Sequence, residues 1–123
     1  MTNPFIDQSR FMRACNQTVG AWNETQFNLY TKLIQEETDE LWAANAAADP
    51  KECLDALIDI LVVTVGAIHS LGADGEGAWN EVMRTNFAKI DPATGRVNKR
   101  EDGKVLKPEG WKPPELEQYI QTR

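Results

Sequence analysis

The chain has 123 residues, of which 41% are hydrophobic, and its formal net charge is −6. This length supports one domain with its own core and leaves too little chain for two. The negative charge argues against binding to polymeric nucleic acid, which requires cationic contacts to phosphates. The longest uncharged apolar run, residues 60–68, is about half as long as a membrane span. We therefore expect a protein that neither binds nucleic acid nor enters a membrane.

The two cysteines, Cys15 and Cys53, do not have the spacing of metal ligands. The first residues also lack the charge and apolar pattern of a secretory leader. Free cysteines without a leader are typical of a reducing compartment. These features predict a cytoplasmic protein.

Four segments have the spacing of apolar residues that is typical of helices. Asn3 and Pro4 indicate the start of the first helix, and Pro50 and Gly72 indicate the start and end of the third. The third segment contains a β-branched run, but its length without a turn signal favours a buried helix over a strand. The fourth has one apolar stripe, formed by Trp79, Val82, Met83, Phe87 and Ile90. The predicted helices cover residues 5–19, 24–48, 50–72 and 78–90.

The sequence after Pro92 is rich in Gly, Pro and Lys and has no helical periodicity. The pair Asp102-Gly103 lies between two short β-forming segments, which predicts a short hairpin or an ordered tail. Most of the lysines and arginines lie between Arg84 and Lys112, so this region is basic. The sequence thus predicts a single all-α domain over residues 1–123, helical over 4–90 and continued by the hairpin or tail over 91–123.

Three glutamates lie within the segment LIQEETDELWAA, residues 33–44, which otherwise has the pattern of a helix with an apolar face. Because each helical residue turns by about 100°, Glu36, Glu37 and Glu40 fall in one arc with Leu33. We expect this arc to face the core. Burying one unpaired carboxylate costs several kcal/mol, so three of them need a compensating cation.

Glu52, Asp55 and Asp59 form a second acidic row on the next predicted helix, because their spacing puts them within about 60° of one another. The two helices are joined by a short link and should pack antiparallel, which brings the two rows face to face. An all-oxygen site of this kind suits Mg²⁺ or Mn²⁺. Solvent exposure or pairing with lysines is the alternative, but Lys51 is the one base between Glu36 and Asp59.

Magnesium held by carboxylates usually takes water and substrate phosphates as its other ligands. The basic segment from Arg84 onward can supply Lys and Arg side chains to the outer oxygens of a polyphosphate. The alternative for this segment is a solvated basic tail. The acidic rows and the basic segment together indicate a phosphoester or nucleotide as substrate.

The acidic pattern Glu36-Glu37-x-x-Glu40 followed by Glu52-x-x-Asp55 resembles the signature of the all-α nucleoside triphosphate pyrophosphohydrolases. This MazG-like superfamily includes MazG, the dimeric dUTPases and phosphoribosyl-ATP pyrophosphohydrolase. Residues 55–68 resemble its second metal helix, residues 80–90 its Asn-x-x-Lys helix, and residues 102–116 the tail of MazG-like proteins common in bacteriophages. The resemblance implies a four-helix bundle-like MazG fold with a basic tail, in a bacterial cell or a phage-infected host.

The resemblance also implies roles for individual residues. Glu37, Glu40, Glu52 and Asp55 match the metal ligands, whereas Glu36 matches a further ligand or the residue that orients the attacking water. Asp59 is a possible ligand that could exchange roles with Asp55. The residues that match phosphate or sugar contacts are Asn86, Lys89, Lys104 and Lys107.

The implied reaction is hydrolysis of a (deoxy)nucleoside triphosphate between the α and β phosphates, which yields a monophosphate and pyrophosphate. Roughly two or three Mg²⁺ ions, replaceable by Mn²⁺, would lower the pKa of the attacking water, with Glu36 or Glu37 as the base. Long apolar faces such as Leu57, Leu61 and Val65 would stay partly uncovered in one chain. We therefore expect a homodimer or homotetramer.

Two other functions are consistent with the sequence. One is hydrolysis of phosphoribosyl-ATP in histidine synthesis, which the Lys-rich tail disfavours. The other is a non-catalytic helical protein that uses the bundle for oligomerisation or metal binding. The preference of some phage relatives for deoxyguanosine triphosphate suggests a purine such as dGTP as the substrate.

Several other side chains are weaker candidates for a functional role. Gln17 and Trp22 are candidates for contact with the base, because an amide can read a base edge and an indole can stack on it. Trp111 is by default a core or interface residue, although it could stack on a base as well. His69 lies near the end of an apolar helix, and we expect a structural role for it.

Overall fold

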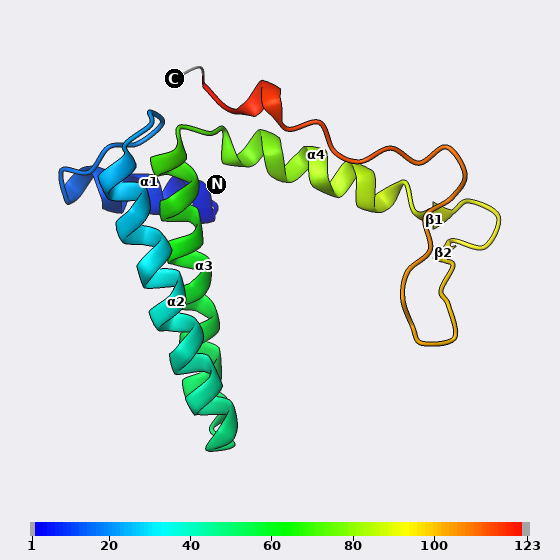
Figure 1. Cartoon of the computed structure of the whole chain (residues 1–123), viewed down its shortest axis with the longest axis horizontal. Helices are drawn as coiled ribbons and strands as arrows, with labels where there is room; N and C mark the ends of the chain where they lie inside the picture. The colour runs from blue at the N-terminus through cyan, green and yellow to red at the C-terminus, as the bar shows by residue number, and fades with distance from the viewer. Residues whose placement is uncertain (1, 122–123) are drawn as a thin grey trace. The chain divides into compact units, whose positions relative to one another are not determined.

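The structure is a computed structural model that describes residues 2–121. It is mostly helical, with a two-stranded sheet, and it confirms the predicted all-α class (Figure 1). The elements are α1 (Pro4–Ala14), α2 (Glu24–Ala46), α3 (Pro50–Leu71), α4 (Gly75–Phe87), β1 (Ile90–Asp91), β2 (Arg96–Val97) and the 3₁₀ helix η1 (Glu117–Tyr119). By their contacts, the described residues form a first unit, 2–75 with 120–121, and a second unit, 76–119. The single domain over the whole chain stays a prediction.

Side-chain caps explain where the first three helices begin. The side-chain oxygens of Asn3, Asn23 and Asp49 each accept a hydrogen bond from the backbone N–H three residues ahead, which satisfies a free donor of the first turn. At the other end of α3, Gly72 has a φ of +84°, a left-handed conformation that suits glycine and ends a helix. The predicted helices 24–48 and 50–72 are confirmed with nearly the predicted bounds.

The first and fourth helices differ from their predictions. The helix predicted over residues 5–19 ends at Ala14, because Asn16 turns into the left-handed region with a φ of 58°. The helix predicted over 78–90 begins at Gly75 and ends at Phe87, and Ile90 opens β1 instead. The predicted apolar stripe therefore loses Ile90. Two of its other members, Trp79 and Phe87, are 58% and 61% exposed.

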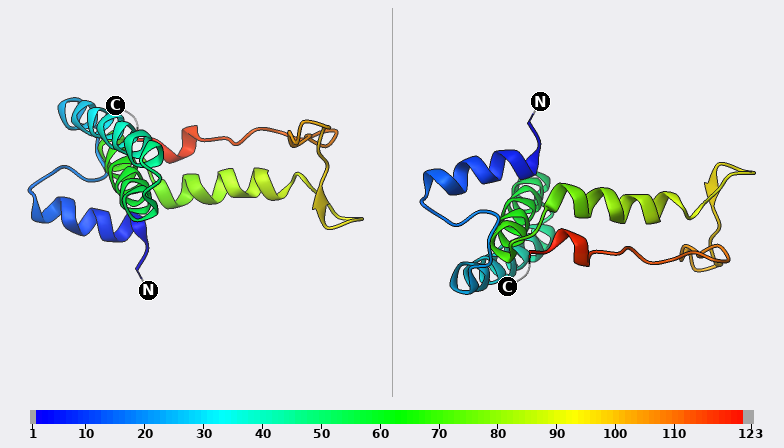
Figure 2. Two further views of the ribbon diagram at one scale, coloured as in Figure 1. Left: turned by 90° about the horizontal axis from the view of Figure 1, so that it is seen from below. Right: turned by 90° about the horizontal axis from the view of Figure 1, so that it is seen from above.

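The first unit is built on α2 and α3, which pack side by side in antiparallel directions (Figure 1). Helix α1 lies at the end of this pair where α2 begins and α3 ends (Figure 1), and it crosses the pair (Figure 2). Its core consists of Met12, Tyr30 and Ala67 with partly buried residues around them, among them Phe27 and Val63. This cluster thus lies at one end of the antiparallel pair, and the acidic rows lie toward the other, where Ala44 and Ala56 are also buried.

Buried polar side chains tie α1 and the following loop to this pair. Nε2 of His69 lies 2.9 Å from the carbonyl oxygen of Phe5, so the imidazole joins α3 to α1 and its predicted structural role is supported by the contact. The amide of Gln26 donates to the carbonyl of Thr18 at 2.7 Å and to Oγ of Ser70 at 2.8 Å. These bonds fix the loop 15–23 against the start of α2.

One face of α3 remains uncovered within a single chain. Its exposed apolar residues are Leu54, Leu57, Ile58, Leu61 and Val62, which are between 38% and 61% exposed. The predicted exposure of Leu57 and Leu61 is confirmed, whereas Val65, predicted to be partly uncovered, is 2% exposed and belongs to the core side. By length and composition α3 passes a test for a membrane-spanning helix, a weak indication because core helices of soluble proteins pass it as well.

The second unit consists of α4, a hairpin region and a returning tail. Strands β1 and β2 pair antiparallel, with Ile90 opposite Val97. Beyond them a bridge between Lys99 and Val105 closes the turn at Asp102-Gly103, which confirms the predicted hairpin. The sequence did not indicate the β1–β2 pair, whose strands have two residues each.

The tail after the hairpin runs back along α4 and is fixed to it by two hydrogen bonds (Figure 1). The indole Nε1–H of Trp111 donates to the carbonyl of Thr85 at 2.7 Å. The backbone N–H of Glu115 donates to Oε2 of Glu81 at 2.8 Å. The tail is therefore an ordered part of this unit.

Candidate functional site

Glu37 is the half-buried acid of α2, and one of its oxygens has no partner. Its Oε2 atom is buried without a hydrogen bond to any group in residues 2–121. A buried polar atom without a partner is costly, and buried side-chain oxygens nearly always have one. The Glu37 carboxylate is therefore in a position that favours a ligand able to bind its free oxygen.

Three further carboxylates lie near Glu37, one from α2 and two from α3. Desolvation, the interaction with Glu40 and the negative charges of Asp59 and Asp55 raise the pKa of Glu37 to about 7. Of the two aspartates, Asp59 has the larger effect. The antiparallel packing of α2 and α3 thus brings acids of both predicted rows together.

The donor atoms of these carboxylates suit a divalent cation. The two salt bridges of the described residues, Arg84 with Glu81 and Arg100 with Asp102, do not involve them. Carboxylate oxygens are the donors that Mg²⁺ and Mn²⁺ prefer. No three Asp, Glu, His or Cys side chains between residues 2 and 121 already have the spacing of a metal cage. A bound ion would have to draw the carboxylate arms closer together.

The remaining predicted acids lie at the margin of this set. Glu36 and Glu52 are exposed, and neither is among the groups that shift the pKa of Glu37. Glu40 is also exposed, so the prediction that all three glutamates of α2 share a buried face is wrong for a single chain. The reason is the period of the helix: the face of α2 that meets α3 passes through Tyr30, Leu33 and Glu37, and the other two acids flank it.

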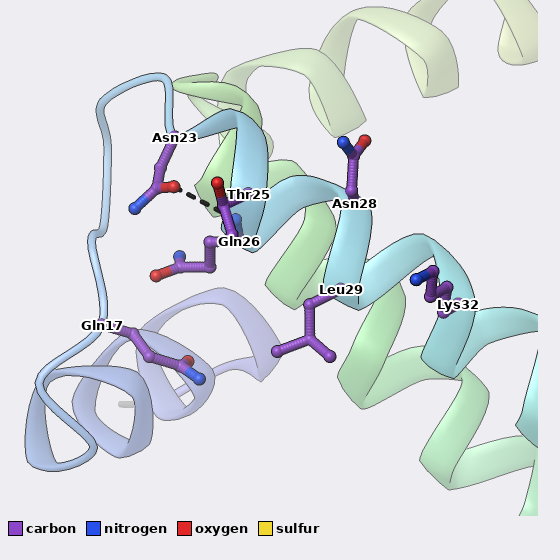
Figure 3. A pocket seen from close by; sticks show the side chains of 7 residues that line it. All are labelled: Gln17, Asn23, Thr25, Gln26, Asn28, Leu29 and Lys32. Carbon is purple, nitrogen blue, oxygen red and sulfur yellow. Dashed lines mark hydrogen bonds between the residues drawn. The ribbon is translucent and has the colours of Figure 1, made fainter.

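A polar surface pocket of about 660 Å³ lies where the loop 15–23 meets the start of α2 (Figure 3). Its lining residues are Gln17, Asn23, Thr25, Gln26, Asn28, Leu29 and Lys32. The side-chain oxygen of Gln17 accepts the hydroxyl of Tyr30, which leaves its amide N–H groups as donors. Trp22, the other predicted base contact, packs against Phe27 with a distance of 5.5 Å between ring centroids and does not line this pocket.

The predicted phosphate contacts belong to the second unit. Nζ of Lys89 donates to Oδ1 of Asn86 at 3.1 Å, and both Lys89 and Lys107 lie over the ring of Trp111. Lys104 is separate from this group, in the hairpin, where its backbone N–H donates to Asp102. The structure thus brings three of the four predicted contacts together.

A model of the phosphoribosyl-ATP pyrophosphohydrolase family matches residues 8–86, which is more than half of the chain and contains both acidic rows. The chain belongs to this family. A search of curated proteins found no match.

Membership of the phosphoribosyl-ATP pyrophosphohydrolase family makes the chain a nucleotide pyrophosphohydrolase, an enzyme that hydrolyses acid anhydrides, within the MazG-like superfamily. Pyrophosphohydrolases of this family generally use divalent metal ions. The match ends at Asn86, so Lys89 and the tail lysines lie outside it. The family assignment therefore rests on the region of the four helices and not on the tail.

Sequence reasoning missed two features of these sites. It left open whether Asp55 or Asp59 is the stronger metal ligand and did not use the helical period from the buried Ala56 through Val63 to Ala67, which places Asp59 near the face toward α2. It also did not predict that Lys89 and Lys107 both lie over the ring of Trp111, because these contacts join the end of α4 to a tail that is distant in the sequence.

Proposed function

We propose that the protein hydrolyses a nucleoside triphosphate between the α and β phosphates in the presence of Mg²⁺, releasing a monophosphate and pyrophosphate. The observation that carries this proposal is the unpartnered, buried Oε2 of Glu37, next to the carboxylates of Glu40, Asp55 and Asp59. Such a cluster favours a hard cation, and a carboxylate-bound Mg²⁺ usually binds phosphate oxygens.

Glu37, Glu40, Asp55 and Asp59 would hold the ions, with Glu52 and Glu36 at the margin as further ligands. When bound, Mg²⁺ or Mn²⁺ lowers the pKa of a water molecule and neutralises charge on the α-phosphate. Glu36 or Glu37 accepts the proton of the attacking water, whose oxygen forms the new bond to the α-phosphorus as the pyrophosphate leaves.

The second unit would supply cations to the polyphosphate. Lys89 and Lys107 carry ammonium groups without a carboxylate partner among the described residues, and Asn86 contacts Lys89 directly. Lys104 is a further candidate from the hairpin. Cations placed at the β and γ phosphates stabilise the charge that builds up on departing pyrophosphate.

The protein would act as a homodimer or homotetramer. The uncovered face of α3 gathers five exposed apolar residues, a patch that soluble chains usually cover. A second copy of the same chain offers an equally apolar face, as expected for a symmetric interface.

A panel of ribonucleoside and deoxyribonucleoside triphosphates with Mg²⁺ or Mn²⁺, run in ¹⁸O-labelled water, tests this function. The expected products are a monophosphate carrying the label and unlabelled pyrophosphate, with no turnover in a chelator. Label in the pyrophosphate, or release of single phosphates, would contradict attack at the α-phosphorus. Absence of turnover with every nucleotide would refute the proposal.

The family match favours a second substrate, phosphoribosyl-ATP, which is cleaved at the same type of bond. The same panel separates the two substrates when phosphoribosyl-ATP is included at equal concentration. We expect the higher kcat/KM for a nucleoside triphosphate, with dGTP as the first purine to compare. A kcat/KM for phosphoribosyl-ATP above all others would reverse this order.

A further inference from the structure

Trp111 is held in place by the end of α4. Its Nε1–H donates to the carbonyl of Thr85 at 2.7 Å, and its backbone N–H donates to the carbonyl of Pro108 at 3.1 Å. The carbonyl of Thr85 belongs to the last turn of α4, where carbonyl groups lack an intrahelical partner. The indole therefore caps a free acceptor, and its ring has a fixed orientation.

Two ammonium groups lie over this one ring. Nζ of Lys89 is 5.1 Å from the ring centroid, and Nζ of Lys107 is 4.7 Å from it. Both distances are within the range of a cation–π interaction, which is strongest for tryptophan. Lys89 follows α4, whereas Lys107 comes from the returning tail, so Trp111 is the residue that brings the two together.

The positive charge of this pair is not neutralised. The salt bridges of the described residues are those of Arg84 and Arg100. Neither Lys89 nor Lys107 has a carboxylate of the described residues within salt-bridge distance. Like charges held near one another repel, and a ring quadrupole offsets this repulsion only in part. The arrangement lacks the negative charge that would balance it.

Space for an anion is available beside the indole. A surface pocket of about 300 Å³ borders Trp111 and is also lined by Arg84, which is paired with Glu81, by Lys112 and by one acid, Glu109; Lys89 and Lys107 do not line it. A polyanion with several oxygens that lies beside the indole can contact more than one cation at once. The local chemistry thus favours a chain of phosphates over a single carboxylate.

We propose that Trp111 is a positioning residue, whose anchored indole holds Lys89 and Lys107 together as one binding site for a polyphosphate. The identity of the polyphosphate as part of the substrate rests on the proposed function, whereas the anion site itself does not. Trp111 acts through the two lysines and needs no contact with the reacting atoms.

Titration with inorganic pyrophosphate in metal-free buffer containing a chelator tests the site without the acidic cluster. In the wild type, pyrophosphate should shift the indole N–H resonance of Trp111. We expect Trp111→Leu to weaken pyrophosphate binding about tenfold, because it removes two cation–π contacts. Trp111→Phe keeps an aromatic face and should retain part of the affinity. Equal affinity of wild type and Trp111→Leu would overturn the proposal.

A double-mutant test distinguishes the proposed positioning role of Trp111 from a role in packing alone, because positioning acts only through Lys89 and Lys107. In the Lys89→Ala/Lys107→Ala background, Trp111→Leu should have no further effect on pyrophosphate binding or on KM. An equal loss in both backgrounds would show that the indole only packs the tail, and would overturn the proposal. Lys99→Ala, which removes a hairpin lysine outside this site, is the matched charge control and should leave affinity within about twofold.

Activity measurements distinguish this inference from the proposed function. With a nucleotide that is turned over, Trp111→Leu should raise KM more than it lowers kcat. If no nucleotide is hydrolysed but pyrophosphate still binds at Trp111, the proposed function is wrong and the anion site stands. If hydrolysis proceeds while pyrophosphate neither binds nor shifts the Trp111 resonance, the inference is wrong and the function stands.

Discussion

The ring of Tyr30 on α2 occupies the space that a side chain of Gly66 on α3 would need. Glu37 follows Tyr30 by seven residues, and Asp59 precedes Gly66 by seven residues. Seven residues are about two helical turns, and the helices run antiparallel, so this contact places Glu37 and Asp59 at the same level. The register of the two acids is thus set by a contact between an aromatic ring and a glycine.

We expect Gly66→Ala to destabilise the fold by about 1–3 kcal/mol, because a Cβ atom would overlap the Tyr30 ring. The sign of the change in stability is informative, because a Gly-to-Ala substitution at an open helical position stabilises the fold by about 1 kcal/mol. Chemical denaturation measures the free energy of unfolding. In a Tyr30→Ala background the substitution should become neutral or stabilising; a full loss there would mean that the Tyr30 ring is not the cause.

The repulsion within the acidic cluster predicts how neutral substitutions change thermal stability and its response to Mg²⁺. Glu40→Gln and Asp55→Asn should each abolish pyrophosphate release and leave the fold intact or more stable, because each removes one charge from a repulsive group. Without metal, their melting temperatures should equal or exceed that of the wild type. Added Mg²⁺ should stabilise them less than it stabilises the wild type.

Differential scanning calorimetry with and without Mg²⁺ measures both effects. Asp39→Asn is the matched control, since Asp39 is exposed on α2 and accepts a hydrogen bond from Gln35. It should keep activity and the full response to Mg²⁺. Turnover at the wild-type rate by both Glu40→Gln and Asp55→Asn would show that these carboxylates are not the metal site.

The long helices could be predicted because local signals determine them. Pro50 and Gly72 are the signals that the sequence offers for the two ends of α3, and the helix begins at Pro50 and is capped by Gly72. The end of α1 was missed, because a local turn closes it: Asn16 takes a left-handed conformation, and the backbone N–H of Gln17 donates to the carbonyl of Met12 at 2.9 Å. The apolar residues continue beyond this turn to Val19, so their periodicity does not reveal it.

The acidic rows were predictable as a group, but the depth of each acid was not. Helical spacing placed Glu36, Glu37 and Glu40 in one arc, yet burial depends on how closely α3 approaches. The contact of Gly66 with Tyr30 sets that approach, and a sequence pattern does not show which glycine meets which ring. This explains why Glu37 is the acid, among residues 2–121, that has a buried oxygen without a partner.

The lowered pKa of Glu81 predicts how the stability of the fold depends on pH. The side chain of Arg84 and the backbone N–H of Glu115 lower the pKa of Glu81 from 4.5 to about 2. A carboxylate whose pKa is lowered by folding stabilises the folded state above its unfolded pKa, and this stabilisation is lost as the pH falls toward its folded pKa. Glu81→Gln should therefore be less stable than the wild type at neutral pH, and the difference should shrink between about pH 4.5 and about pH 2.

Thermal unfolding of both proteins as a function of pH measures this difference. Glu117→Gln, at an exposed acid of η1, is the control and should stay within about 0.5 kcal/mol of the wild type at neutral pH. A destabilisation by Glu81→Gln that is as large at pH 2 as at pH 7 would mean that packing of the side chain, and not its charge, holds the tail.

The uncovered face of α3 makes the last prediction, which concerns assembly. Leu57 and Leu61 are 50% and 45% exposed and lie one helical turn apart, so a second copy that covers them would bury both. Leu61→Glu would place a charge in that interface and should convert an oligomer into a monomer, with a loss of thermal stability. Light scattering at micromolar concentration measures the mass of each variant. Leu106→Glu, at a comparably exposed leucine of the tail, should leave the mass unchanged. A wild type that is itself monomeric at this concentration would refute the homodimer or homotetramer.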